Sequence, residues 1–214
     1  MECFFRRRRK EARPGEIAAA ALETFVEKGF AATRLDEVAA RAGVSKGTVY
    51  LYFESKEALF KAAIDAAMTP AVEAAEALAN DGERPAAELL RCFVAGWWDM
   101  VGATALGGLP KLLVAESGNF PEISQWFHDS MIRRAQKAMA RIIAAGIARG
   151  EFRAVDAELA ARVFFAPMFS YLLWQRAFDP KVCDLPPAER FFDAALDLFI
   201  HGLASSQTQT EPRS

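Results

Sequence analysis

The stretch TRLDEVAARAGVSKGTVYLYF, residues 33–53, predicts two short helices joined by a tight turn. Thr33 fits the N-cap of the first helix, and Asp36 lies in its first turn, where the helix dipole favours negative charge. Gly43 ends that helix, and Ser45 fits the N-cap of the second. Two helices joined in this way form a helix-turn-helix, in which the second helix is free to enter the major groove of DNA.

The spacing within the second helix predicts one buried face and one exposed face. Val49 and Phe53 are four residues apart and are expected to pack inward. Gly47 leaves room at the helix N-terminus, where unpaired amides suit a phosphate group. A tyrosine and a leucine exposed on so short a helix fit contacts to sugars, phosphates and thymine methyl groups. The outward-facing residues are Lys46, Thr48, Tyr50 and Leu51.

The flanking sequence predicts helices on both sides of this motif. Residues 14–29, PGEIAAAALETFVEKG, place apolar side chains on one face between a proline and a glycine, and another helix restarts at Ser55. From Pro70 onward, breaks that contain Gly or Pro separate five further helices. Because no segment alternates as a strand does, we expect an all-α fold of about nine helices.

Residues 29–60, GFAATRLDEVAARAGVSKGTVYLYFESKEALF, closely resemble the DNA-binding region of the TetR (tetracycline repressor) family of bacterial regulators. The resemblance extends over about residues 14–66 and includes the turn at Gly43 and a lysine at Lys56. It implies an all-α homodimer. Each subunit would join a three-helix DNA-binding domain to a larger C-terminal domain for ligand and partner.

Carried over position by position, the resemblance implies DNA contacts from three places: the start of the second helix, the recognition helix and the start of the fourth helix. Leu51 departs from the family, which often has an aromatic residue there, and Arg34 stands where a hydroxyl residue is common. Thr33 and Ser45 could instead act only as helix caps, and Tyr52 could be partly buried. The implied contacts are Thr33, Arg34, Ser45, Lys46, Gly47, Thr48, Tyr50, Leu51, Tyr52 and Lys56.

Positive charge is concentrated at the N-terminus of a chain whose formal net charge is -2. Residues 1–13 hold six Lys or Arg against two Glu. The run precedes the first helix, where N-terminal arms of the family approach phosphate or the minor groove. We expect an arm that grips DNA without reading its sequence, although a solvated disordered terminus would have the same composition. The contacts expected from the arm are Arg6, Arg7, Arg8, Arg9 and Lys10.

Aromatic residues are dense in the C-terminal half, above all in residues 88–101 and 159–178. Such residues can simply form the core. Alternatively, some of them line a cavity for an apolar or aromatic small molecule, since pockets between helices are mostly apolar. A lone histidine among them is more often structural than a ligand contact. The candidates are Trp97, Trp98, Phe127, His128, Met131, Phe164, Phe165, Met168 and Phe169.

The last two expected helices, about 156–178 and 187–204, are apolar over more than one face. A helix that is apolar nearly all round must be buried, which predicts pairing with a second subunit. The resemblance implies a four-helix interface of this kind. The expected organisation is a basic arm (1–13), a DNA-binding domain (14–66), a helical ligand-binding and dimerisation domain (67–205) and a disordered tail (206–214).

Composition argues against several other classes of protein. Cys3, Cys92 and Cys183 lie far apart, and His128 and His201 are the only histidines, so neither a metal site nor a catalytic triad is indicated. We therefore expect no cofactor and no enzymatic activity. No apolar run is long enough to span a membrane and no secretory signal is visible, which favours the cytosol.

These patterns predict a ligand-responsive transcriptional regulator. The resemblance favours a repressor that binds a palindromic operator as a homodimer and is released by a small apolar or aromatic effector. One alternative is an activator, or a DNA-binding regulator without a ligand. Another is a helical carrier or enzyme that retains the N-terminal domain as a scaffold.

Overall fold

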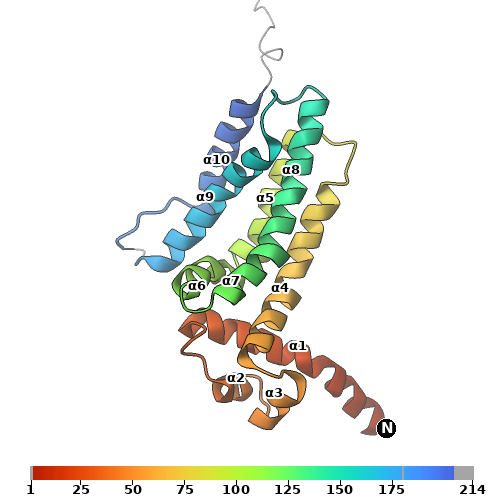
Figure 1. Cartoon of the computed structure of the whole chain (residues 1–214), viewed down its shortest axis with the longest axis vertical. Coiled ribbons are helices and arrows are strands. Elements are labelled where there is room, and N and C mark those ends of the chain that lie inside the picture. Colours follow the sequence, from red (N-terminus) through yellow and green to blue (C-terminus); the bar gives the residue numbers. More distant parts are fainter. Residues whose placement is uncertain (1, 180, 205–214) are drawn as a thin grey trace, which may run out of the picture.

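The computed structural model describes residues 2–179 and 181–204, with side chains from Arg13 onward. In these ranges the chain forms ten α-helices and no strand, as expected for an all-α fold (Figure 1). The α-helices are α1 (Glu2–Lys28), α2 (Leu35–Arg41), α3 (Lys46–Tyr52), α4 (Lys56–Leu78), α5 (Ala86–Trp97), α6 (Leu109–Glu116), α7 (Pro121–Phe127), α8 (Arg133–Ala148), α9 (Ala157–Ala177) and α10 (Ala188–Leu203). Three short turns link them: η1 (Trp98–Gly102), η2 (Ala105–Gly108) and η3 (His128–Ile132). The tail expected at 206–214 lies outside the described residues.

Two prolines near boundaries predicted from the sequence lie inside helices of the structure. The first helix was expected to start at Pro14, but α1 begins at Glu2 and includes this proline. A proline removes one backbone donor, while the Arg, Lys, Glu and Ala residues before it favour helix. Likewise α4 continues through Pro70, so the expected domain boundary near residue 66 falls within one helix. The α1 helix projects from the body at its N-terminal end (Figure 1).

The buried side chains form two clusters whose limits differ from the expected domains. The first joins α1–α4 to α6 and α7, and its centre contains the rings of Phe25, Phe30 and Phe60, with centroids 5.0–5.5 Å apart. The second lies among α5, α8, α9 and α10. In Figure 1 the helix-turn-helix lies at one end of the molecule, α6 and α7 lie in the middle, and α4 runs between the two ends.

The described part of the chain holds no helix with the length and apolar character that a membrane span requires. Within the same residues, no group of three or more His, Cys, Asp or Glu side chains is arranged to hold a metal ion.

Candidate DNA-binding surface and effector cavity

The turn between α2 and α3 is fixed by local hydrogen bonds. Gly43 has φ of +65°, a conformation that favours glycine, and the Val44 amide donates to the Ala39 carbonyl at 2.9 Å. Ser45 caps α3, because its Oγ accepts from the Thr48 amide at 3.1 Å. The start of the recognition helix is therefore held rigidly against α2.

The two faces of α3 differ sharply in burial. Val49 is fully buried in the first cluster, whereas Tyr50 is 51% exposed and Leu51 is 72% exposed. Gly47 is also exposed, and a Cβ built there would meet only the Ser45 hydroxyl, at 3.8 Å. Nothing within the described chain requires a glycine at this position. The solvent-exposed face of α3 is therefore largely apolar and includes a glycine.

Charged side chains flank this face. The Lys46 ammonium lies 2.8 Å from a carboxylate oxygen of Asp36, and the Arg34 guanidinium lies 3.6 Å from the other. The hydrogen bond from Lys46 holds the pKa of the Asp36 carboxyl below its ordinary value, and the same contact raises the pKa of Lys46. One carboxylate thus positions two basic side chains beside α3.

Ion pairs also fasten α2 to α1. The Arg41 guanidinium binds the Glu27 carboxylate through two hydrogen bonds of 3.0 and 2.6 Å, and Lys28 binds Glu37 at 2.7 Å. The contact with Arg41 lowers the pKa of Glu27, and the contact with Lys28 lowers that of Glu37. These pairs are solvent-exposed, so each contributes only modestly to stability.

The loop between α1 and α2 is held from two sides. From α4, the Lys56 ammonium donates to the carbonyl of Ala31 at 3.1 Å and of Thr33 at 3.3 Å, and it lies 4.7 Å from the centroid of the Phe30 ring. From α6, the Glu116 carboxylate accepts a hydrogen bond from the Ala31 amide at 2.9 Å. The loop that precedes the helix-turn-helix is thus tied directly to the middle of the molecule.

A second set of contacts supports this junction. The ring of Phe120, which follows α6, packs edge-on against Phe30 with centroids 4.6 Å apart. Gly108, just before α6, lies so close to α1 that a Cβ there would come within 2.4 Å of Val26. The two ends of α6 therefore both contact the N-terminal helices.

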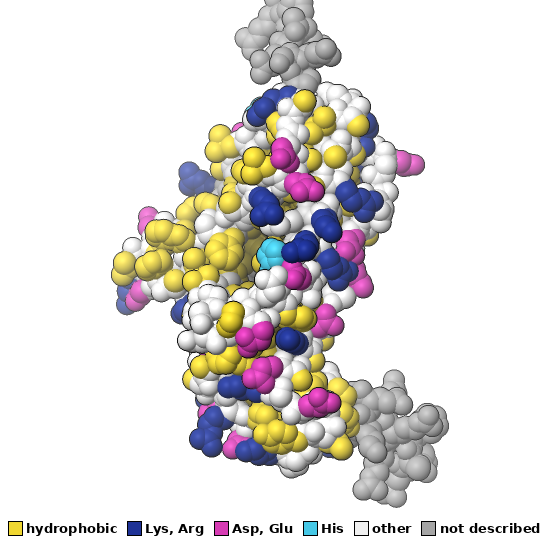
Figure 2. Space-filling model, in the orientation of Figure 1, with side chains coloured by type: hydrophobic (Ala, Val, Ile, Leu, Met, Phe, Trp, Pro, Cys, Tyr) yellow, Lys and Arg dark blue, Asp and Glu magenta, His cyan; other side chains and the backbone are white. Residues whose placement is uncertain are grey.

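An apolar cavity of about 350 Å³, here called the central cavity, opens among α4, α5, α6, α8 and α9. Its size lies at the lower end of the range for small-molecule sites. Three residues of α6, Leu109, Pro110 and Leu113, line it. Figure 2 shows hydrophobic side chains gathered over α9 and α10, with a hollow in the surface between them and α6–α7.

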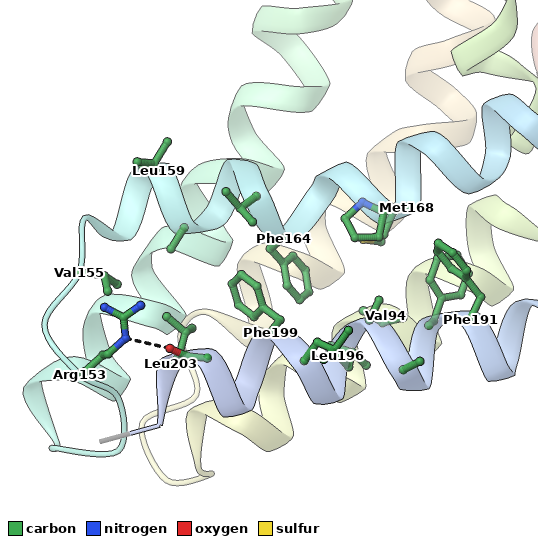
Figure 3. A pocket seen from close by; sticks show the side chains of 18 of the residues that line it. Val94, Arg153, Val155, Leu159, Phe164, Met168, Phe191, Leu196, Phe199 and Leu203 are labelled. Atoms are coloured by element: carbon green, nitrogen blue, oxygen red, sulfur yellow. Dashed lines mark hydrogen bonds between the residues drawn. The ribbon is translucent and has the colours of Figure 1, made fainter. Parts of the chain in front are cut away.

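A larger groove of about 700 Å³, here called the α9–α10 groove, runs between the last two helices. Phe164 and Phe199 face one another across it, with ring centroids 5.3 Å apart (Figure 3). The Arg153 guanidinium donates to the Gly202 carbonyl at 2.8 Å near its end. Large exposed side chains also line the groove, and Leu198 is 75% exposed. Within one subunit, this apolar surface remains open.

Two family models cover most of the chain. The model described as "Bacterial regulatory proteins, tetR family" matches residues 17–63. The model described as "AefR-like transcriptional repressor, C-terminal domain" matches residues 88–202, more than half of the chain. The chain belongs to the TetR family. It is a DNA-binding transcriptional regulator with the fold expected from the sequence.

Solved structures of TetR-type regulators share this fold over nearly their whole length. FadR of Bacillus subtilis, in complex with stearoyl-CoA, is 23% identical with a TM-score of 0.73, and the match covers 88% of this chain and 98% of FadR. SmeT, the repressor of the Stenotrophomonas maltophilia multidrug efflux pump SmeDEF, is also 23% identical with a TM-score of 0.73, over 94% of this chain and 96% of SmeT. At these identities the likeness shows the fold alone.

Curated relatives match over a shorter stretch. The transcriptional regulator RutR of Escherichia coli K12 is 48% identical over 59 residues, which are 28% of each protein. The matched region covers only 17 to 28% of the length of the first curated relatives. These proteins are transcriptional regulators, which gives no support to an enzymatic role for this TetR-family chain.

The structure changes the interpretation of two implied DNA contacts. The N-cap of α2 is Arg34 and not Thr33 as expected. Thr33 is buried, and its hydroxyl donates to the Gly29 carbonyl at 2.6 Å with the Thr24 carbonyl 3.3 Å away, so it is not directed toward phosphate. Lys56 uses two of its three N–H donors on the adjacent loop and keeps one for another partner.

The other implied contacts lie together on one surface of the TetR-type DNA-binding domain. Tyr52 is partly buried against the first cluster, and the Ser45 hydroxyl serves as the cap of α3. The side chains from Arg6 to Lys10 lie outside the described residues, although the backbone of the expected arm is helical. The contacts that remain exposed are Arg34, Ser45, Lys46, Gly47, Tyr50 and Leu51, with Thr48 half-buried among them.

The structure also sorts the candidate ligand contacts. Trp98 packs in the second cluster against Tyr171 and Phe192, Phe164 lines the α9–α10 groove, and His128 pairs with Asp129 at the surface. These three are not among the described residues that line the central cavity. The six candidates that do line it are Trp97, Phe127, Met131, Phe165, Met168 and Phe169.

Polar residues of the central cavity were absent from the sequence-based set. Arg162 and Gln136 both line it. Aromatic density gives no signal for either residue. A helical projection of residues 157–177 does place Arg162 three and seven residues before Phe165 and Phe169, on the same face.

Proposed function

We propose that this protein is a ligand-responsive repressor that binds a palindromic operator as a homodimer in the cytosol. The observation that carries the proposal is the exposed face of α3, where Tyr50 and Leu51 project beside the cation of Lys46 on a helix whose start is capped. Such a face suits the major groove, with the tyrosine and leucine toward sugars and thymine methyl groups and the lysine toward phosphate.

The α9–α10 groove supports dimerisation. Its exposed leucine and valine side chains, Leu159, Val163 and Leu198, are the surface that a second copy of the chain would bury in a four-helix interface. Two recognition helices related by the dimer axis would then lie about 34–36 Å apart, one turn of DNA. A palindromic operator follows from that symmetry.

The basic N-terminal segment would add affinity that does not depend on sequence. Residues 14–66 hold six Lys or Arg against eight Asp or Glu, so the excess of positive charge lies in residues 1–13. Removal of residues 2–10 should weaken binding to all DNA sequences. It should also reduce the slope of log affinity against log salt by about 0.9 for each phosphate that the shortened chain no longer neutralises.

The central cavity would hold an apolar effector that releases the operator. The match to the C-terminal domain of AefR-like repressors and the likeness to SmeT, a repressor, support repression rather than activation. FadR, which was solved with stearoyl-CoA, supports an apolar ligand. The effector must bind more tightly to the subunit arrangement that does not fit the operator. Equal affinity for both arrangements would leave the equilibrium between them unchanged.

The proposal is tested by selecting genomic DNA fragments with the purified full chain at moderate salt and mapping the protected bases. We expect enrichment of one motif with two-fold symmetry and protection of two adjacent major grooves on one face of the duplex. If no sequence is enriched over input, or the protected site lacks symmetry, the proposal of a dimeric operator-binding regulator fails. Transcription from a promoter that carries the motif then distinguishes repression from activation.

A further inference from the structure

The central cavity has an uneven distribution of polar groups. Among the described residues that line it, Arg162 is the single charged side chain and Gln136 the single amide. No aspartate or glutamate belongs to this described lining, and the remaining side chains are aliphatic, aromatic or thioether. An apolar chamber therefore has one cation at its wall and no anion there to neutralise it.

Arg162 also differs from several other arginines of the described chain. Arg134 binds Glu76 through two hydrogen bonds of 2.9 Å, Arg84 binds Asp81 at 2.8 Å, and Arg133 binds Asp129 at 2.7 Å. Within the described residues, neither the Arg162 guanidinium nor the Gln136 amide has a hydrogen-bond or ion-pair partner. Arg162 is solvent-exposed while it lines the cavity, so its guanidinium lies at the rim, where an entering molecule would meet it.

We infer that the effector is an apolar molecule with one anionic group, of the carboxylate type, whose charge is held by Arg162 with help from Gln136. The planar guanidinium can donate two parallel hydrogen bonds to a carboxylate. The rings of Phe165 and Phe169, on the same face of α9, would enclose the apolar part. This inference rests on the proposed function and names the chemical class of the ligand.

The cavity volume sets the size of a suitable probe. A volume of about 350 Å³ accommodates on the order of a dozen non-hydrogen atoms, if each takes the roughly 30 Å³ that a water molecule occupies in the liquid. Decanoate has this size. The alcohol 1-decanol and protonated decylamine have the same chain with a neutral or a positive end, so the three compounds differ mainly in charge.

Calorimetric titration of the full chain with these three compounds tests the inference. We expect decanoate to bind at least about tenfold more tightly than 1-decanol, and decylamine to bind more weakly than either. Arg162→Met, which keeps an apolar stem, should weaken decanoate binding by about tenfold or more and leave 1-decanol binding unchanged. Arg91→Met, at an exposed position of α5 outside the cavity, serves as the matched control and should change neither.

The outcomes separate this inference from the proposed function. If decanoate and 1-decanol bind equally and Arg162→Met changes neither, the anionic class is wrong, although an apolar effector cavity stands. If octanoate, decanoate, dodecanoate and 1-decanol all fail to bind, the cavity is not an effector site. Both the anionic class of the ligand and the proposed effector cavity then fail. Release of operator DNA is measured in parallel, since binding without release contradicts only the proposed regulation.

Discussion

At the scale of single residues, burial separates contacts with DNA from contacts within the fold. Tyr50 and Val49 are adjacent on α3, but the tyrosine is exposed and the valine is fully buried. Tyr50→Ala should weaken operator binding by about tenfold and leave thermal unfolding nearly unchanged. Val49→Ala should lower the free energy of unfolding by about 2 kcal/mol because it removes two buried methyl groups. If Tyr50→Ala unfolds as easily as Val49→Ala, the tyrosine belongs to the core.

Gly47 offers a test in which stability and DNA binding move in opposite directions. An alanine there meets no atom of the described chain closer than 3.8 Å and replaces a poor helix former, so Gly47→Ala should stabilise the protein by about 0.5–1 kcal/mol. The added methyl group would occupy the space into which a phosphate backbone must come, and operator affinity should fall. Urea unfolding and DNA-binding titrations measure the two effects. Higher stability with unchanged affinity would show that DNA does not approach this residue.

Residue types alone do not assign every role near the turn. Ser45 and Gly43 are predictable from local chemistry, because a cap and a left-handed glycine depend on neighbours in sequence. The prediction of Thr33 as the N-cap of α2 is wrong, because Arg34 is the N-cap and the Thr33 hydroxyl turns back to the carbonyl of Gly29, four residues earlier. Two local partners therefore compete for this hydroxyl, and the residue type alone does not say which of them it takes.

At the scale of elements, the connection between α4 and α5 depends on one carboxylate. Asp81 accepts hydrogen bonds from the amides of Glu83 and Arg84, each at 3.0 Å, and from the Arg84 guanidinium at 2.8 Å. These three hydrogen bonds lower the pKa of the Asp81 carboxyl from 3.8 to about 2. The bond from the Arg84 amide has the largest effect, followed by the bonds from the Arg84 guanidinium and the Glu83 amide. The ionised carboxylate is therefore the form that holds the turn.

The depressed pKa predicts a pH-dependent effect of Asp81→Asn. Because the folded-state pKa is below the unfolded value, the carboxylate stabilises the fold fully above pH 3.8 and loses this effect as pH falls toward 2. The difference in urea midpoint between the wild-type chain and Asp81→Asn should be largest near pH 6 and should narrow as pH is lowered to about 3. Glu83→Gln removes one charge from the same turn and keeps the Asp81 carboxylate, so it serves as the matched control. A constant difference for Asp81→Asn would contradict the role of the charge.

Most element boundaries follow the glycines, caps and prolines of the sequence, and two prolines are exceptions. The ends of α9 and α10 lie within about two residues of those expected. Pro14 fits a helix start and Pro70 marks where the Ala-rich part of the sequence begins, yet each lies inside a helix, since good helix formers nearby outweigh one missing hydrogen bond. The π-helical turns η1 and η3, which begin at Trp98 and His128, were not predicted from the sequence pattern.

At the scale of the whole molecule, the α9–α10 groove makes dimerisation testable. Leu198 is exposed and lines this groove, so Leu198→Arg should place a charge in the interface and yield monomers by light scattering. Operator affinity should then fall by about 100-fold or more, since the second half-site no longer adds to binding. Val114→Arg changes an exposed apolar residue of α6 outside the groove and should keep the dimer. A dimeric Leu198→Arg would exclude this surface as the interface.

The junction between the two ends of the molecule could not be predicted from the sequence. Ala31 and Glu116 are 85 residues apart, and their hydrogen bond forms only because α6 packs against α1. The same helix lines the central cavity through Leu109, Pro110 and Leu113. One element therefore contacts both the proposed effector site and the loop that precedes the recognition unit, which makes it a physical route for coupling.

Glu116→Ala should weaken that coupling more than it weakens either binding event. The substitution removes the acceptor for the Ala31 amide, so a ligand-induced shift of α6 would be transmitted less directly to the loop. We expect the factor by which decanoate weakens operator binding to fall several-fold, which is the range of one hydrogen bond to a charged group. Operator titrations with and without saturating decanoate measure this factor.

Glu116→Gln is the matched control, because its amide oxygen can still accept from Ala31, and it should keep most of the coupling. Hydrogen exchange supplies a readout without ligand: the Ala31 amide should exchange faster in Glu116→Ala than in Glu116→Gln, since only the first leaves the donor unpaired. If the Ala31 amide exchanges faster and the coupling factor is still that of the wild-type chain, α6 packs against the DNA-binding domain without carrying the signal. The elements that would then be tested next are α4 and α7, which also have residues in both the cavity lining and the first cluster.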